Sequence, residues 1–191
     1  MDVCRQQIIL TVALVLVTGS LAQVFSFGKC PSIQLKQNFQ LGSYLGKWYE
    51  KRRFFAIFET FGSCVSANYS LKDDGHVKVV NQEYIKFLKK DNVAIGDAYV
   101  PDANEPAKLK VKFGSGPLGD YWVLDTDYDN YSIVYSCNSY GGIFKIEFSW
   151  ILTRERNGLS DAKIQKLLQS MSSSGINVER FSVTDQSNCP N

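Results

Sequence analysis

The chain has little of what metal and nucleic-acid sites require. Its 191 residues contain one histidine and five cysteines, and no two cysteines form a close Cys-x-x-Cys pair. Zinc sites usually use such pairs, so we expect no metal and no cofactor. The formal net charge is +2, and the densest basic cluster, Lys51-Arg52-Arg53, is not extended elsewhere. Because nucleic-acid binders normally carry a basic stripe, no nucleic-acid partner is predicted.

The sequence also lacks a hydrophobic run long enough to span a bilayer. The apolar run Ile8 to Val17 falls short of the roughly 20 residues that a span requires. Arg5 precedes it, and Ser20-Leu21-Ala22 follows with small residues at the two positions that signal peptidase reads. This pattern predicts a secretory signal peptide over residues 1–22 and a single secreted, extracellular domain over residues 23–191.

Cysteine is scarce but even in number once this leader is removed. Cleavage would take Cys4 and leave Cys30, Cys64, Cys137 and Cys189. An even number of cysteines in a secreted chain predicts two disulfides, for which three pairings exist.

What the mature chain has in abundance is alternation of apolar and polar residues. In Ala107 to Phe113 every second residue is a lysine, which is typical of a strand with one dry and one wet face. The same alternation in Cys64 to Leu71 directs Tyr69 inward, and in Phe144 to Leu152 it directs Trp150 inward.

Two Asn-x-Ser sequons begin at Asn68 and Asn130, and both are predicted glycosylation sites. A glycan needs an exposed side chain. The alternation directs Asn68 away from the apolar face, as glycosylation requires.

Further short runs complete a predicted all-β fold. They are Trp48 to Phe58, Val77 to Tyr84, Val93 to Val100, Tyr121 to Asp125 and Tyr131 to Cys137. Eight strands in antiparallel succession predict a sandwich or an up-and-down barrel, and alternation alone does not decide between them.

One late segment follows the helical period instead. Apolar residues recur at helical spacing at Ile164, Leu167, Leu168 and Met171. Ser160 is a suitable N-cap and Gly175 a suitable stop. We therefore expect one helix packed outside the sheet, followed by a short ninth strand at Val178 to Val183.

Three short motifs occur in a fixed order along this pattern. Gly46-Lys47-Trp48 opens the first strand, Thr126-Asp127-Tyr128 lies in a later turn, and Arg154 ends the last barrel strand. Together with the cysteines and the late helix, they resemble the three-part signature of the lipocalin family. The resemblance covers nearly the whole mature chain. It implies an eight-stranded antiparallel up-and-down barrel with one C-terminal α-helix outside and a short ninth strand.

The resemblance implies structural roles for these motifs. Arg154 would lie across the face of Trp48 and close the narrow end, with a cation–π contact worth about 0.5–2 kcal/mol. Thr126 and Asp127 are typical of turn chemistry. The family pattern also implies the disulfides Cys30–Cys137 and Cys64–Cys189.

The barrel interior is the predicted binding site, because eight strands leave room for side chains or one small ligand. The resemblance implies a lining of Tyr44, Tyr69, Phe113, Tyr121 and Trp150, and alternation adds Tyr99, Val123 and Tyr135. Aromatic walls with a few hydroxyls suit a hydrophobic ligand such as a fatty acid (arachidonate, for example), a steroid, a retinoid or a bilin. The predicted function is a secreted lipid carrier that catalyses nothing.

Alternatives remain open at this point. A pigment-binding or signalling lipocalin would carry a bilin or engage a cell-surface receptor, and a barrel filled by side chains would be structural only. A prostaglandin-isomerase type of lipocalin needs an unpaired thiol in the pocket, whereas all four mature cysteines are expected to pair. Peripheral lipoprotein or membrane contact is not favoured by the segment between Phe113 and Tyr121, where only Leu118 is apolar.

Overall fold

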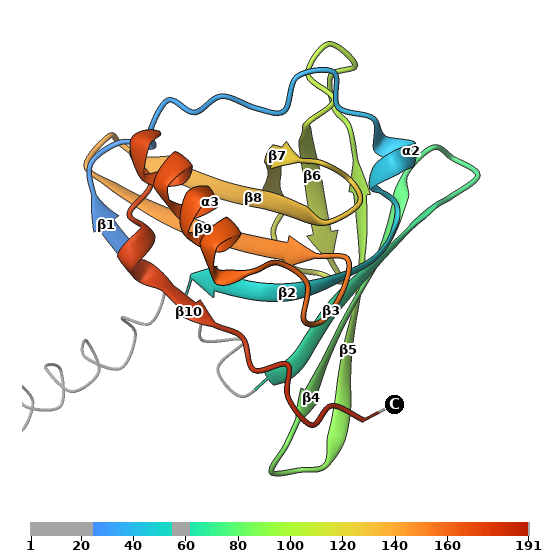
Figure 1. Cartoon of the computed structure of the whole chain (residues 1–191). Helices are drawn as coiled ribbons and strands as arrows, with labels where there is room; N and C mark the ends of the chain where they lie inside the picture. Colours follow the sequence, from blue (N-terminus) through green and yellow to red (C-terminus); the bar gives the residue numbers. More distant parts are fainter. Residues whose placement is uncertain (1–24, 55–61, 191) are drawn as a thin grey trace, which may run out of the picture.

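The computed structural model describes residues 25–54 and 62–190, which form one closed antiparallel sheet (Figure 1). The sheet closes because β2 (Gly46–Phe54) pairs with β9 (Phe144–Thr153) as well as with its neighbour in sequence. This closure decides for a barrel over a sandwich. The predicted signal peptide over residues 1–22 lies outside the described residues, as does the end of the strand predicted to reach Phe58.

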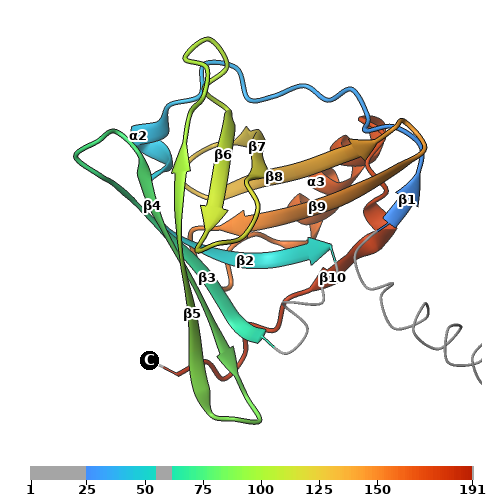
Figure 2. The same cartoon turned by 180° about the vertical axis from the view of Figure 1, so that it is seen from behind.

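Eight strands, β2 to β9, make up the wall in up-and-down order, as Figure 2 shows from behind. Between β2 and β9 they are β3 (Gly62–Leu71), β4 (Val77–Ile85), β5 (Lys90–Tyr99), β6 (Lys108–Phe113), β7 (Gly119–Thr126) and β8 (Tyr131–Tyr140). Two short strands lie at the margins: β1 (Phe25–Phe27) pairs with β9, and β10 (Phe181–Val183) pairs with β2.

The alternation of β6 produces the expected two faces. Leu109 is buried, and Val111 and Phe113 pack against the cluster of apolar side chains inside the barrel. Lys110 points away from this cluster and its Nζ contacts Asp120 at 2.5 Å.

Helix α3 (Asp161–Ser173) packs on the outside of the barrel, as predicted. The Ser160 hydroxyl accepts a hydrogen bond from the Lys163 amide at 3.3 Å, so the predicted N-cap is confirmed. Ile164, Leu167 and Met171 are the buried residues of the helix. They cover a face of the sheet that would otherwise expose apolar side chains.

One local expectation needs correction, and one short element was not predicted. Of the ninth strand predicted over Val178 to Val183, the first half is a 3-10 helix, η2 (Val178–Arg180), and only Phe181–Val183 is a strand. The sequence also gave no sign of α2 (Leu41–Tyr44), a single helical turn that precedes β2.

Both disulfides implied by the resemblance are present. Cys30 is bonded to Cys137 and Cys64 to Cys189, which closes segments of 107 and 125 residues. The first ties the N-terminal segment to β8 and the second ties the C-terminal segment to β3.

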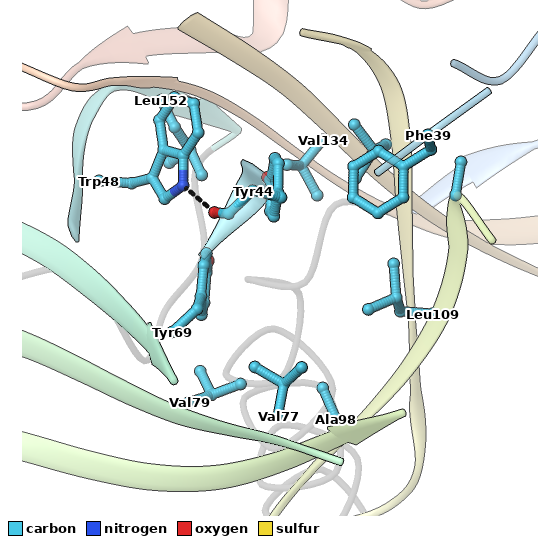
Figure 3. Close-up of a cluster of buried hydrophobic side chains, with 12 residues drawn as sticks. Phe39, Tyr44, Trp48, Tyr69, Val77, Val79, Ala98, Leu109, Val134 and Leu152 are labelled. Carbon is cyan, nitrogen blue, oxygen red and sulfur yellow. Dashed lines mark hydrogen bonds between the residues drawn. The ribbon is translucent and has the colours of Figure 1, made fainter. Parts of the chain in front are cut away.

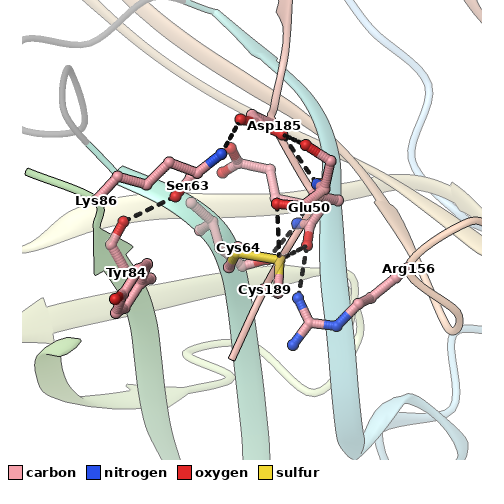
Figure 4. Close-up of a disulfide and its surroundings, with 11 residues drawn as sticks. Glu50, Ser63, Cys64, Tyr84, Lys86, Arg156, Asp185 and Cys189 are labelled. Carbon is pink, nitrogen blue, oxygen red and sulfur yellow. Dashed lines mark hydrogen bonds and ion pairs between the residues drawn. A yellow bond between two sulfur atoms is a disulfide. The ribbon is translucent and has the colours of Figure 1, made fainter. Parts of the chain in front are cut away.

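The C-terminal segment fills a gap in the barrel wall where β2 and β3 separate. These strands pair only from Gly46 to Tyr49 of β2. Beyond that point Thr184 donates its amide to the Lys51 carbonyl at 3.2 Å, and Cys64 donates its amide to the Asp185 carbonyl at 2.8 Å. Figure 4 shows this segment beside the Cys64–Cys189 bond.

The side chain of Gln186 adds a bridge across the same gap. Its Nε2 donates to the carbonyl of Glu50 on β2 at 2.8 Å and to that of Val65 on β3 at 2.7 Å. Backbone groups that β2 and β3 do not satisfy for each other are thus satisfied by the chain end.

Candidate functional site

One end of the barrel is closed by the contact between Arg154 and Trp48. The guanidinium carbon lies 3.8 Å from the centroid of the Trp48 ring, which is fully buried. The guanidinium also donates to the carbonyls of Tyr128, Lys47 and Ser43 at 2.7, 3.0 and 3.0 Å. A planar fork with five donors can make such a set of contacts, whereas an ammonium cannot. The predicted stacking of Arg154 on Trp48 is therefore present.

The glycine of the first motif allows the backbone conformation found beside this contact. Gly46 has a φ of +91°, and a Cβ at this position would lie 3.4 Å from Nη1 of Arg154. A side chain here would strain the backbone, although its Cβ would make only an ordinary contact with the guanidinium.

The second motif forms the predicted turn. Thr126 donates its hydroxyl to the Tyr131 carbonyl at 2.6 Å and accepts the Tyr128 amide at 2.9 Å. Burial acts to raise the pKa of Asp127, but hydrogen bonds from the amides of Tyr131 and Asn130 outweigh it and leave that pKa lowered. Both signature motifs thus hold the closed end together.

The interior above this end is lined by apolar side chains from around the wall, as the close-up in Figure 3 shows. Six of the predicted lining residues belong to it: Tyr44, Tyr69, Phe113, Tyr121, Val123 and Trp150. The sequence prediction missed other members, which are mostly small or aliphatic: Phe39, Val77, Val79, Ala98, Leu109, Val134 and Leu152. Alternation on β4 and β6 was the signal that could have found Val77, Val79 and Leu109.

Four hydroxyl groups supply the polar part of this lining. The Tyr44 hydroxyl lies 2.8 Å from that of Tyr121 and 2.9 Å from that of Ser132. The Tyr69 hydroxyl lies 3.0 Å from that of Tyr121. Burial raises the pKa of Tyr44 to about 12 and also raises the pKa values of Tyr69 and Tyr121. The three phenols are therefore neutral at physiological pH.

The interior is not filled on all sides. Trp48 and Val123 are fully buried, whereas Phe113, Tyr121 and Trp150 point inward and yet are only half-buried. Tyr121 is held far inside by its contacts with Tyr44 and Tyr69. A side chain that faces the inside of a closed barrel retains accessible surface where it borders open space.

A buried ion pair lies near this lining, and the sequence analysis missed it. Nη1 of Arg53 lies 2.7 Å from Oε1 of Glu50, which also accepts the Thr184 hydroxyl at 2.5 Å. Burial raises the pKa of Glu50, and the Glu50 carboxyl is close enough to raise that of Tyr69. Charge is thus present beside an otherwise neutral interior.

Two residues predicted to line the interior lie elsewhere, and those predictions are wrong. Tyr135 belongs to the outer cluster beneath α3, and its hydroxyl donates to Glu147 at 2.6 Å. Tyr99 stacks on His76 with ring centroids 5.2 Å apart, while its neighbour Ala98 faces the interior. In β8 the side chains that point inward are Ser132 and Val134. The polar Ser132, and not the aromatic Tyr135, therefore lies on the inner face of this strand.

The opposite end of the barrel carries exposed apolar residues, of which the sequence analysis singled out only Leu118. The turns β4–β5, β6–β7 and β8–β9 lie at one end in an up-and-down order. Phe87 and Leu88 are 70% and 57% exposed in the first of them, and Ile143 is 68% exposed in the last. Leu118 in the middle turn is also exposed.

Two kinds of site are not found in the described part of the chain. Residues 25–54 and 62–190 contain no cluster of three or more His, Cys, Asp or Glu that could hold a metal ion. None of the helices described is long and apolar enough to cross a membrane.

A closed antiparallel barrel with an outer helix, one end closed by an arginine on a tryptophan and a partly open apolar interior defines a class of small-molecule-binding barrels. The chain belongs to the lipocalin family: a model of the lipocalin-like domain matches residues 39–186.

Comparison with known proteins agrees with this assignment. The chain is 45% identical to apolipoprotein D of Cavia porcellus over 179 residues, which cover 92% of each protein. It is 33% identical to the Lazarillo protein of Schistocerca americana, covering 93% of this chain and 83% of that one.

Solved structures match the fold over most of its length. Lobster apocrustacyanin A1 superimposes with a TM-score of 0.76 at 26% identity, covering 90% of this chain and 96% of that one. Insecticyanin from the tobacco hornworm Manduca sexta gives a TM-score of 0.72 at 26% identity, covering 87% and 90%.

Proposed function

We propose that the protein is a secreted carrier that binds one small hydrophobic molecule inside its barrel and transports it. The observation that carries this proposal is the half-buried state of Phe113, Tyr121 and Trp150, which face inward and border open space. The similarity to apolipoprotein D, over nearly the whole chain, supports the same function. A fatty acid, steroid, retinoid or bilin fits an aromatic lining with few polar groups.

We propose binding without catalysis. Each of the four cysteines in the described segments is in a disulfide, which leaves no thiol nucleophile there. Titration of free thiols on the native, folded protein tests this. One reactive buried thiol would favour the isomerase alternative.

The extracellular location and the glycans belong to the same proposal. Disulfides persist in oxidising compartments, and the leader over residues 1–22 would deliver the domain over residues 23–191 there. Asn68 and Asn130 are both exposed, as glycosylation requires. Mass spectrometry of the secreted protein before and after glycosidase treatment measures the occupancy of both sites. A cell-surface receptor as a partner stays a prediction.

Binding inside the barrel is tested by titration with a fluorescent fatty acid and its methyl ester. We expect saturable quenching of Trp150 by one ligand per chain, with a Kd of about micromolar or below. The variant W150F should lose most of the quenching, whereas W122F should keep it, because Trp122 packs in the outer cluster. Absence of both quenching and displacement would leave a structural barrel only.

We also propose that the end of the barrel opposite the Arg154–Trp48 contact makes peripheral contact with lipid surfaces. Phe87 and Leu88 are exposed and are followed in sequence by Lys89 and Lys90, and such a combination suits an anionic bilayer interface. Co-sedimentation with vesicles of anionic phospholipid should fall several-fold in the double variant F87S/L88S and remain unchanged in V183S. Val183 is a matched control because it is equally exposed but lies on β10.

A further inference from the structure

The four interior hydroxyls form one unbranched chain. Its order is Ser132, Tyr44, Tyr121 and Tyr69, with oxygen–oxygen distances of 2.9, 2.8 and 3.0 Å. Each contact needs one donated hydrogen, and each hydroxyl carries one. Because four hydrogens serve three contacts, one hydroxyl hydrogen has no acceptor among the described residues.

The geometry places this unused hydrogen on Tyr121. Ser132, Tyr44 and Tyr69 are buried, and a buried donor without an acceptor is unfavourable. Tyr121 is half-buried and borders the open part of the interior. In this arrangement Tyr44 and Tyr69 both donate to the Tyr121 oxygen, whose own hydrogen points into the open space. Accepting two hydrogen bonds polarises that hydroxyl and strengthens it as a donor.

The surroundings favour an acceptor without charge. Glu50 and Arg154 influence the ionisation of Tyr69 in opposite directions, and both nearby guanidinium groups are already engaged. Arg53 pairs with Glu50 at 2.7 Å, and Arg154 stacks on Trp48 and donates to three backbone carbonyls. A ligand carboxylate at the hydroxyl chain would lose its hydration and gain one neutral donor in return. A carbonyl oxygen loses far less and needs only that one donor.

We propose that Tyr121 determines ligand specificity by donating a hydrogen bond to an uncharged carbonyl oxygen. The ligand class is therefore an apolar molecule that ends in a ketone, an aldehyde or an ester. This inference rests on the proposed carrier function and names the ligand class of the same site.

The test compares three long-chain probes with one skeleton: a methyl ketone, the matching hydrocarbon and the matching carboxylic acid. The full mature protein with both disulfides should bind the ketone about tenfold more tightly than the hydrocarbon. The acid should bind more weakly than the ketone. Tyr121→Phe should abolish the ketone preference and leave the Kd of the hydrocarbon within about twofold.

Two matched variants separate this role from a merely structural one. Tyr69→Phe leaves three hydroxyls and two contacts, so one hydrogen remains unused on Tyr121. Tyr121 then accepts one hydrogen bond instead of two, so the ketone preference should decrease but not disappear. Tyr140→Phe removes an exposed hydroxyl near the β8–β9 turn and should change nothing. Equal loss of the preference in Tyr69→Phe and Tyr121→Phe would overturn the proposal.

A measurement on the unmodified protein covers the case in which Tyr121→Phe does not fold. The carbonyl stretching band of the bound ketone should lie at lower frequency than in an apolar solvent, because the oxygen accepts a hydrogen bond. An unshifted band, or tightest binding of the acid, would overturn the inference and leave the carrier function intact. Failure of every probe to bind would overturn the carrier function, and this inference with it.

Discussion

The hydroxyl of Tyr135 donates to the carboxylate of Glu147 at 2.6 Å on the outside of the barrel. The same carboxylate accepts from Ser26 of β1 and pairs with Lys145 and Arg180, so it joins the N-terminal strand, the wall and η2. Burial acts to raise the pKa of Glu147, and these donors outweigh it and hold that pKa below its ordinary value.

A lowered pKa makes Glu147 a pH-dependent source of stability. Its contribution is present above the unfolded pKa of about 4.3 and is lost as the pH falls through the lower folded value. E147Q should lower the free energy of unfolding by about 2–4 kcal/mol at neutral pH, because Lys145 and Arg180 lose their partner. Its stability should then vary less than that of the parent protein between about pH 5 and the folded pKa. Urea unfolding across this range measures both, with E179Q on the exposed Glu179 as the control.

Arg154→Lys tests the closure of the narrow end. Lysine retains the charge but cannot stack on Trp48 and reach three carbonyls together, so we expect a loss of about 1–3 kcal/mol in unfolding free energy. Thermal or urea unfolding measures the loss. K166A, on the exposed face of α3, should lie within about 0.5 kcal/mol of the parent. A similar stability of R154K and K166A would contradict the assigned role.

Removal of the Cys64–Cys189 bond should loosen the gap between β2 and β3 locally. The double variant C64S/C189S loses a cross-link over 125 residues, worth at most about 4–5 kcal/mol by chain entropy. Hydrogen exchange should accelerate at the amides of residue 64 and Thr184, whose hydrogen bonds join the C-terminal segment to β3 and β2. The matched variant C30S/C137S should leave those two amides protected. Uniform acceleration in both variants would argue against a local role.

Leu167→Ala separates stability from binding. Leu167 is buried between α3 and the outer face of the barrel, so its truncation should cost about 2–5 kcal/mol. Because the interior lining is untouched, the Kd for the fluorescent methyl ester should stay within about twofold. Q165A, exposed on the same helix, is the control for both measurements. A large change in Kd for L167A would contradict the separation of the two clusters.

Where one face of a strand or helix is exposed to solvent, the sequence was enough to predict both the element and its orientation. The lysines of β6 and the apolar spacing of α3 predicted both elements and the inward direction of Phe113. On β8 this signal vanishes, because every residue from Tyr131 to Cys137 is buried, some inside the barrel and some beneath α3. Alternation of polarity then does not indicate which side chains point into the barrel, and Tyr135 was assigned to the wrong face.

The pair Glu50–Arg53 could not be predicted for a different reason. In a regular strand, residues three apart point to opposite faces. The pairing of β2 with β9 shifts register between Glu50 and Arg52, and the extra residue of such a bulge brings the two charges together. The amino-acid sequence from Glu50 to Arg53 contains no feature that predicts this bulge.

Completion of the wall by residues 184–186 has a consequence for biosynthesis. During translation, β2 and β3 are synthesised long before residues 184–186, which bridge them. The gap between these two strands therefore stays open until those residues have been synthesised. Folding of this part of the wall must wait until residues 184–186 have been synthesised, and a truncation that removes them should yield a protease-sensitive product that cellular quality control retains.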